Sequence, residues 1–232
     1  MRAVEVLVIV LFVGIAVTAA ILSWQAEQKR RAAMQALAQE LGLHYEAGDD
    51  ASHDDEYAQF AIFRRGHSRV AQNTLRGRLE LFGRPCPVVL GDFRYKVTRS
   101  NGKSSSTTTY RFSYLIVHPP WPSPSLLVRP EGLFDKLKGA FGFDDIDFES
   151  SEFSKRFYVQ SDDKRFAYDV LHPRMMEFLL AERPPMLDLE GGALCLSDGQ
   201  RRWDPAGYRG QLAFLRRFCE LWPRHLVKDL ET

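Results

Sequence analysis

Two runs of the chain, "RVAQNTLRGRLELF" at residues 69–82 and "CPVVLGDFRYKVTR" at residues 86–99, decide the fold. The residues between them, "GRP" at 83–85, combine glycine and proline, which mark turns. Both runs carry β-branched and aromatic residues over short stretches, as strands do. The pattern predicts two antiparallel strands on either side of this turn.

A third run, "YRFSYLIVHPP" at residues 110–120, follows the polar stretch "SNGKSSSTTT" at 100–109. Alternation within it places Tyr110, Phe112 and Tyr114 on one face, which is typical of a half-buried antiparallel strand. The second and third runs therefore predict a hairpin with a long polar tip.

The stretch "VLVIVLFVGIAVTAAILSW" at residues 6–24 contains no charged residue. A helix of this length spans roughly 28 Å, close to the hydrocarbon thickness of a bilayer. A core helix is seldom apolar on every face over five turns. A cleaved signal peptide, processed near "AVTAA" at 16–20, is the main alternative, but its apolar region would be shorter and the segment before it more basic. We predict a short N-terminal segment at 1–5 and an uncleaved transmembrane helix at 6–24.

The charges that flank this helix predict its orientation. Upstream, one arginine is offset by a glutamate, whereas "QKRR" follows downstream and carries three basic residues. The positive-inside rule then places the C-terminal side in the cytoplasm of a single-pass cell-membrane protein. The basic residues would also attract anionic lipid head groups, by about 1 kcal/mol each. The predicted membrane-interface residues are Trp24, Lys29, Arg30 and Arg31.

Residues 25–42 are predicted to form a juxtamembrane helical stalk. Met34, Leu37, Ala38 and Leu41 recur on one helical face, and a glycine follows as a natural stop. This face would pack on the domain or pair with a second copy of the chain. Small residues four apart in the apolar helix, at 14 and 18 and at 16 and 20, are compatible with a homodimer through the membrane and stalk helix.

The rest of the chain, residues 43–232, is predicted to be one cytoplasmic α+β domain in which an antiparallel sheet packs with helices. The joint between two short helices falls at His172–Pro173, where the histidine is suited to capping. The expected downstream elements are a helix at 131–142, a strand at 145–150, a turn at 151–157, a hairpin about Gly191–Gly192, and a final helix from Asp204 to Trp222.

Acidic residues offer the main candidates for a metal site. Asp145, Asp147 and Glu149 would share one face of the strand at 145–150, and three carboxylates can hold a hard cation. A solvent-facing edge that resists strand pairing explains the same pattern and is favoured. His53 begins "HDDE", but neighbours in sequence rarely converge on one metal, so these acids are assigned to a helix N-terminus.

Net charge, cysteine spacing and the motifs give no support for nucleic-acid binding, a disulfide framework or a known catalytic site. The formal net charge of +1 does not favour nucleic-acid binding. The three cysteines, at 86, 195 and 219, are dispersed and fit a reducing compartment. No cofactor-binding motif and no catalytic constellation is recognisable, although triads can assemble from distant positions. Packing rather than catalysis is therefore assigned to His172.

The run "DFESSEFSKRFYVQSDDKRFAYDVLHPRMMEFLL" carries a resemblance that covers residues 146–180. Its "EFSKRF" turn, its "SDD" step and its helix "PRMMEFL" resemble the signature of an uncharacterised prokaryotic family of membrane-anchored proteins with a domain of unknown function. The resemblance implies a membrane location and a similar fold. It implies no activity and no catalytic residue.

The leading hypothesis is a single-pass membrane protein whose cytoplasmic domain binds a protein partner or a ligand near the bilayer. The alternative is a membrane-bound enzyme that acts on a lipid or envelope precursor, with the acids at 145–149 and His172 as its candidate residues. A homodimeric structural element acting through the stalk is a third class.

Overall fold

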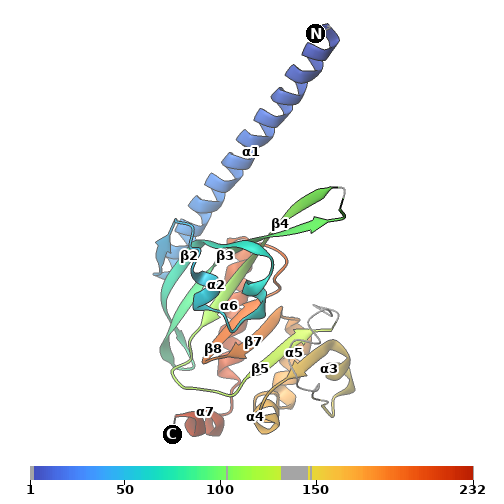
Figure 1. The fold of residues 1–232 in the computed structure, drawn as a ribbon. Helices are drawn as coiled ribbons and strands as arrows, with labels where there is room; N and C mark the ends of the chain where they lie inside the picture. The colour runs from blue at the N-terminus through green and yellow to red at the C-terminus, as the bar shows by residue number, and fades with distance from the viewer. Residues whose placement is uncertain (1–2, 103, 132–145, 147, 232) are drawn as a thin grey trace.

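A long helix and an antiparallel sheet with helices on it make up the molecule, so the predicted α+β class is confirmed (Figure 1). The computed structural model describes residues 3–102, 104–131, 146 and 148–231. The predicted helix at 131–142 and two of the candidate acids, Asp145 and Asp147, lie outside the described residues.

Helix α1 (Ala3–Leu41) runs without a break through the predicted transmembrane helix and stalk. Within the described residues it is the one helix long and apolar enough to cross a membrane, by length and composition. Its apolar half is exposed, and Figure 1 shows this half extending away from the domain. The single N-terminal apolar helix expected from the sequence is therefore present.

All the strand pairs are antiparallel, and the described residues form one eight-stranded sheet in the order β1-β2-β3-β4-β8-β7-β5-β6. The strands are β1 (His44–Glu46), β2 (His67–Leu81), β3 (Arg84–Ser100), β4 (Ser105–Val117), β5 (Leu126–Pro130), β6 (Phe157–Gln160), β7 (Met186–Glu190) and β8 (Ala193–Ser197).

The three hairpins expected from the sequence are present, with two corrected tips. The first turn is Phe82–Gly83, both with positive φ, because Arg84 already pairs with Leu81. The second hairpin has a shorter tip than predicted, since the polar residues 105–109 pair with 96–100 and extend β4. Threonine is β-branched and favours this extended conformation. The third turn is at Gly191–Gly192, as predicted.

The shorter helices also follow their capping signals. Asp204 accepts a hydrogen bond from the Gly207 amide and caps the helix Pro205–Glu220, as predicted. This helix is not the final one, because a further helix follows at Arg224–Leu230. His172 caps the helix after its joint, where its Nδ1 accepts from the Met175 amide. The described helices after α1 are α2 (His53–Glu56), the 3-10 helix η1 (Ala61–Arg64), α3 (Ser151–Arg156), α4 (Lys164–Val170), α5 (Pro173–Glu182), α6 (Pro205–Glu220) and α7 (Arg224–Leu230).

The strand predicted at 145–150 is wrong in its described part, because residues 148–150 form no ladder. The Phe148 amide donates to the Ser154 hydroxyl at 3.1 Å, and that hydroxyl donates back to the Phe148 carbonyl at 3.3 Å. A side chain of α3 thus takes the backbone groups that a strand would use. Glu149 is exposed beside this turn.

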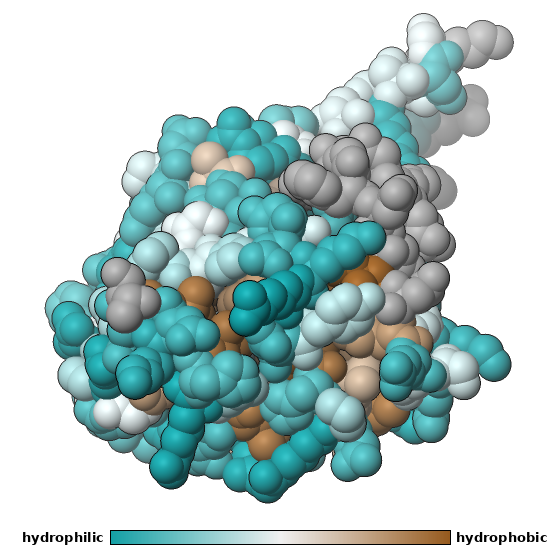
Figure 2. All heavy atoms as spheres, turned by 90° about the horizontal axis from the view of Figure 1, so that it is seen from below, coloured by the Kyte–Doolittle hydropathy of each residue, from teal (hydrophilic) through white to brown (hydrophobic). Residues whose placement is uncertain are grey.

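The sheet is covered on both faces, and alternate residues of β3 belong to two different cores. Val88 and Leu90 pack with apolar side chains of α1 and α4 to α7. Val89 and Phe93 pack in a second, aromatic core with residues of η1. Figure 2 views the end of the domain opposite the N-terminus and shows mostly hydrophilic residues with hydrophobic groups between them. That end is suited to face water.

Candidate functional site: the junction between the membrane helix and the domain

The C-terminal part of α1 is built into the domain. Met34, Leu37 and Ala38 are no more than 1% exposed and belong to the main core. These residues form the helical face that the sequence indicates, and the structure packs that face on the domain. A helix held by its own core residues cannot swivel without breaking that core.

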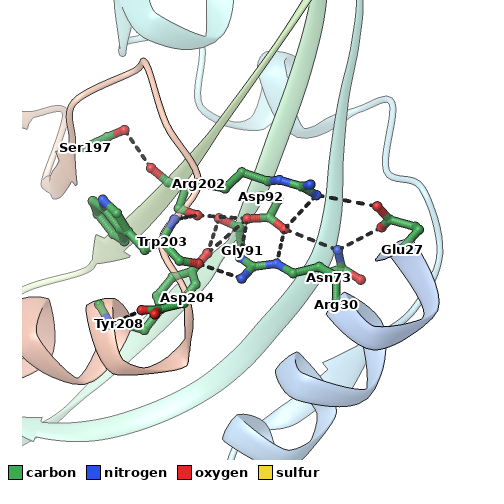
Figure 3. A network of polar contacts seen from close by, with 12 residues as sticks. Glu27, Arg30, Asn73, Gly91, Asp92, Ser197, Arg202, Trp203, Asp204 and Tyr208 are labelled. Atoms are coloured by element: carbon green, nitrogen blue, oxygen red, sulfur yellow. Dashed lines mark hydrogen bonds and ion pairs between the residues drawn. The ribbon is translucent and has the colours of Figure 1, made fainter. Parts of the chain in front are cut away.

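Arg30 continues the same helical face toward the membrane and ends in a buried ion pair. Its Nε and Nη2 donate to the two carboxylate oxygens of Asp92 at 2.9 and 2.7 Å, and its Nη1 donates to the Trp203 carbonyl at 2.6 Å (Figure 3). The two side chains are 11% and 3% exposed. Burial alone would lower the pKa of Arg30, but the hydrogen bond and charge of Asp92 outweigh it and leave this pKa raised. Arg30 therefore stays charged at any physiological pH.

The Asp92 carboxylate is the centre of a wider network. It also accepts from the Ser113 hydroxyl at 2.8 Å and from the Asn73 amide at 3.3 Å. The Tyr208 hydroxyl donates to the neighbouring Gly91 carbonyl at 2.6 Å, and the Trp203 amide donates to Ser113 at 2.9 Å. We call Arg30, Asn73, Asp92, Ser113, Trp203 and Tyr208 the polar clamp.

The polar clamp joins five parts of the chain at one point. Its members come from α1, from β2, β3 and β4, and from α6 with the loop before it, as Figure 3 shows for its labelled residues. Removing one partner of a buried charge pair costs about 3–5 kcal/mol, because the other charge stays buried. The clamp therefore fixes the angle at which α1 leaves the domain.

Two exposed ion pairs flank the polar clamp along α1. Glu27 contacts Arg202 at 3.4 Å, and Glu40 receives two hydrogen bonds from Arg209 at 2.8 and 2.6 Å. Exposed pairs contribute little, roughly 0–1 kcal/mol each. These two pairs help to fix the position of α1 along the domain and contribute little to stability.

The predicted membrane-interface residues separate at this junction. Trp24 is 64% exposed, and Lys29 and Arg31 are exposed beside it, so all three are free to meet lipid. Arg30, in contrast, has its partner inside the domain. Trp24 precedes Arg30 by six residues, about 9 Å along a helix, so the domain begins directly after the apolar segment.

The β3–β4 hairpin projects from the domain on the side where α1 leaves it (Figure 1). Leu43, just after α1, packs over Gly77, which pairs with Val88, while Arg30 pairs with Asp92. From Val88 to Asp92, β3 therefore runs antiparallel to α1, toward the apolar half of that helix. Beyond Asp92, β3 continues for eight residues, about 26 Å, to its last residue at position 100. The hairpin is therefore long enough to reach the level of Trp24.

The projecting part of this hairpin is basic. From residue 93 to residue 130 the sequence contains no aspartate and no glutamate. Arg99 and Arg111 are exposed on it, and Tyr110 is 36% exposed. Arg94 contacts Asp49 at 3.4 Å and is the basic residue nearest the domain body. We call residues 93–111 the basic hairpin.

The other residues singled out in the sequence have structural environments. The His172 Nε2 donates to the Leu221 carbonyl at 3.0 Å, so both ring nitrogens serve the helix joint. The three cysteines are buried. Within the described residues, one group of acids and histidine converges closely enough to hold a metal, namely Asp50, His53 and Glu56. The sequence analysis assigned the acids after His53 to a helix N-terminus rather than to a metal site, and it missed Asp50, which lies three residues before His53.

Sequence reasoning also missed Asp92 and the basic hairpin. Arg30 stands four and seven residues before Met34 and Leu37, so it shares their buried face, and this spacing was the available signal. An aspartate between Leu90 and Phe93, in an otherwise apolar strand, was the second signal.

Together these features define an α+β domain carried rigidly on one apolar helix of membrane-spanning length. No family model and no curated protein matches the chain. Among solved structures, it is similar to the crystal structure of the mycobacterial trehalose monomycolate transport factor A, with a TM-score of 0.55 and 12% identity. The match covers 82% of this chain and 93% of that one. At this identity the likeness shows a shared fold.

Proposed function

We propose that the chain is a single-pass membrane protein whose domain is a binding module, held in a fixed orientation on the cytoplasmic surface of the bilayer. There it presents a docking surface to a membrane-embedded partner that handles envelope lipids. The domain acts by position, and its rigid attachment is the feature that matters for function.

The polar clamp is the observation that carries this proposal. A domain that needed only to stay near the membrane would be served by a flexible linker. Here α1 is continuous, and a buried ion pair lies about 9 Å from the end of the apolar segment. Apolar residues of similar size would stabilise this position equally well, so we infer that the pair is retained here because it fixes one arrangement.

The basic hairpin supports a second contact with the same membrane. Basic residues near an anionic leaflet each contribute about 1 kcal/mol of attraction. Together with Lys29 and Arg31 they would hold the domain at two separated points, so that it could not rotate about α1. Anionic lipids are concentrated on the cytoplasmic leaflet, which agrees with the orientation from the positive-inside rule.

The assignment to envelope lipids is supported by the structural neighbour, a mycobacterial trehalose monomycolate transport factor. The family resemblance of residues 146–180 agrees with a membrane-anchored protein. Both are supporting observations for the proposal.

A change of helical register tests the proposed function. Two alanines inserted after Gln25 would turn the domain by about 200° and lift it by about 3 Å without touching its core. We expect this variant to reach the membrane at normal levels and to fail to complement a strain that lacks the gene. The same two residues inserted after Arg2, beyond the apolar segment, are the matched control and should complement.

A flexible ten-residue Gly-Ser insertion after Gln25 gives the decisive comparison. It keeps the domain folded and near the membrane but removes its fixed angle. Full complementation by this variant would refute the proposal, because a tether would then be sufficient. The side of the membrane is tested by Ser104→Cys, which impermeant thiol reagents should label only after permeabilisation. The native cysteines are buried and leave the background low.

A further inference from the structure

Asp50, His53 and Glu56 converge beside the aromatic core, on the sheet face opposite the polar clamp. Asp50 precedes α2 and bridges to Ala71 of β2, while His53 and Glu56 are the first and last residues of α2. His53 and Glu56 are three residues apart, about one helical turn, so they share one side of α2, and the bridge to β2 places Asp50 beside them. One ligand atom from each side chain lies within 4.8 Å of the others.

His53 is buried without a polar partner. Its side chain is 0% exposed, and neither ring nitrogen makes a hydrogen bond. The ring is held by aromatic contacts, with centroids 4.7 Å from Tyr57, 4.8 Å from Phe63 and 4.6 Å from Tyr114. Buried polar atoms are nearly always paired, so an imidazole locked in place with both nitrogens unpaired points to a ligand.

The two carboxylates are held in place by neighbouring donors. Asp50 Oδ1 accepts from the Ser52 amide at 2.8 Å and from its hydroxyl at 2.6 Å. Arg76 contacts Glu56 at 3.2 Å and the second oxygen of Asp50 at 3.5 Å. One guanidinium against two carboxylates leaves a net negative charge at the cluster. Donors of this kind orient metal-binding carboxylates in known sites.

We propose that Asp50, His53 and Glu56 bind a divalent transition-metal ion of the Zn²⁺ class. One imidazole nitrogen with two carboxylate oxygens is a three-ligand set that Zn²⁺ accepts, with a fourth position left for water or a ligand. The nitrogen favours Zn²⁺ over Mg²⁺ and Ca²⁺, which prefer oxygen alone. Arg76 takes the role of an outer residue that orients both carboxylates.

Metal binding to the purified full chain in detergent, first treated with a chelator, tests this proposal. We expect one Zn²⁺ per chain by titration calorimetry. Saturating Zn²⁺ at about 100 times its dissociation constant should raise the melting temperature by about 5–10 °C. Mg²⁺ at the same concentration should leave it unchanged.

Three variants locate the ion. His53→Phe keeps a ring in the aromatic core and removes the nitrogen, while Asp50→Asn changes a partly exposed residue and keeps its size. Each should weaken Zn²⁺ binding at least about tenfold, in line with the loss of one metal ligand. His225→Gln, at an exposed histidine of α7, controls for surface binding and should bind like the unaltered chain. Equal binding by the unaltered chain and both cluster variants, no binding by any of them, or an equal response to Mg²⁺ would each overturn the proposal.

Discussion

Arg30 and Asp92 form the charged centre of the junction, and their environment decides what each contributes. Asp92 receives donors from Arg30, Ser113 and Asn73, so its charge is satisfied only while all of these elements are assembled. The two residues are 62 positions apart in sequence, and no local pattern pairs them. What the sequence does show is that Arg30 lies on the buried face of α1.

Arg30→Ala is expected to reduce the free energy of unfolding by about 3–5 kcal/mol, because it leaves Asp92 buried without its main partner. Urea unfolding of a fragment that begins at Glu27 measures this loss. Replacing both residues, Arg30→Met with Asp92→Leu, should restore most of the stability, since an apolar pair of similar size needs no partner. Arg31→Ala, at the exposed neighbouring position, is the control and should change stability by less than about 0.5 kcal/mol. A loss in Arg30→Ala no larger than in this control would contradict the clamp.

Asp188 gives a second prediction at the residue scale, one that concerns pH. Burial, together with the charge of Glu190, raises the pKa of Asp188 to about 8. In the unfolded chain this pKa is about 3.9. Between these two values the folded protein holds a proton that the unfolded chain has lost, so stability falls as the pH rises from about 4 to about 8.

Asp188→Asn should remove this contribution. Between pH 5 and pH 8 the unaltered protein is expected to lose at least about 1 kcal/mol more stability than the variant does. Urea unfolding at the two pH values measures the difference. Parallel pH profiles for the two proteins would mean that Asp188 titrates near its ordinary pKa when folded.

At the scale of single elements, the sequence predicts turns and helix caps well, because both depend on residues a few positions apart. The Gly191–Gly192 turn and the Asp204–Pro205 cap were correct because glycine and capping residues act within a few positions. The strand at 145–150 was wrong in its described part because the Ser154 hydroxyl, six residues away from Phe148, takes its backbone groups. The pattern of acids at these positions gave no sign of that hydrogen bond.

The stalk is the element whose role changes most. The sequence predicts a stalk at 25–42 separate from the domain at 43–232, but Met34, Leu37 and Ala38 of α1 are buried in the core of that domain. A periodic apolar face predicts that this side of the helix is buried. It does not show whether the domain or a second copy of the chain buries it.

A fragment that begins at residue 43 is therefore expected to aggregate or to unfold without cooperativity, because it exposes this core and leaves Asp92 unpaired. A fragment that begins at Glu27 keeps both and should be soluble and unfold cooperatively. Size-exclusion chromatography and thermal unfolding of the two compare them directly. Equal solubility and equal melting temperatures would show that α1 contacts the domain without stabilising its core.

The basic hairpin leads to a prediction about lipid. For the fragment from Glu27, we expect Arg99→Glu with Arg111→Glu to weaken binding to vesicles that contain anionic lipid by at least about tenfold, since each basic residue contributes about 1 kcal/mol. The control pair, Arg174→Glu with Arg216→Glu, makes the same change in net charge at exposed positions of α5 and α6. Equal losses in the two pairs would mean that net charge alone determines binding.

For the whole molecule, the membrane segment and the α+β class followed from composition and periodicity. The relation between them did not, because it depends on contacts between α1 and strands distant in sequence. The family resemblance at 146–180, the homodimer and the cytoplasmic orientation stay predictions, as does the choice between a binding module and a membrane-bound enzyme.

The central claim is that the domain is locked against the bilayer surface, with the basic hairpin toward the lipid and α7 away from it. Fluorescence quenching by head-group-labelled lipids tests this claim on the full chain in nanodiscs, with a fluorophore at Ser104→Cys or, in a second protein, at Lys228→Cys. We predict strong quenching at position 104 and almost none at position 228. The ten-residue Gly-Ser insertion after Gln25, which frees the domain from the direction of α1, should erase the contrast between the two positions. Equal quenching at both sites in the otherwise unaltered chain would contradict the account.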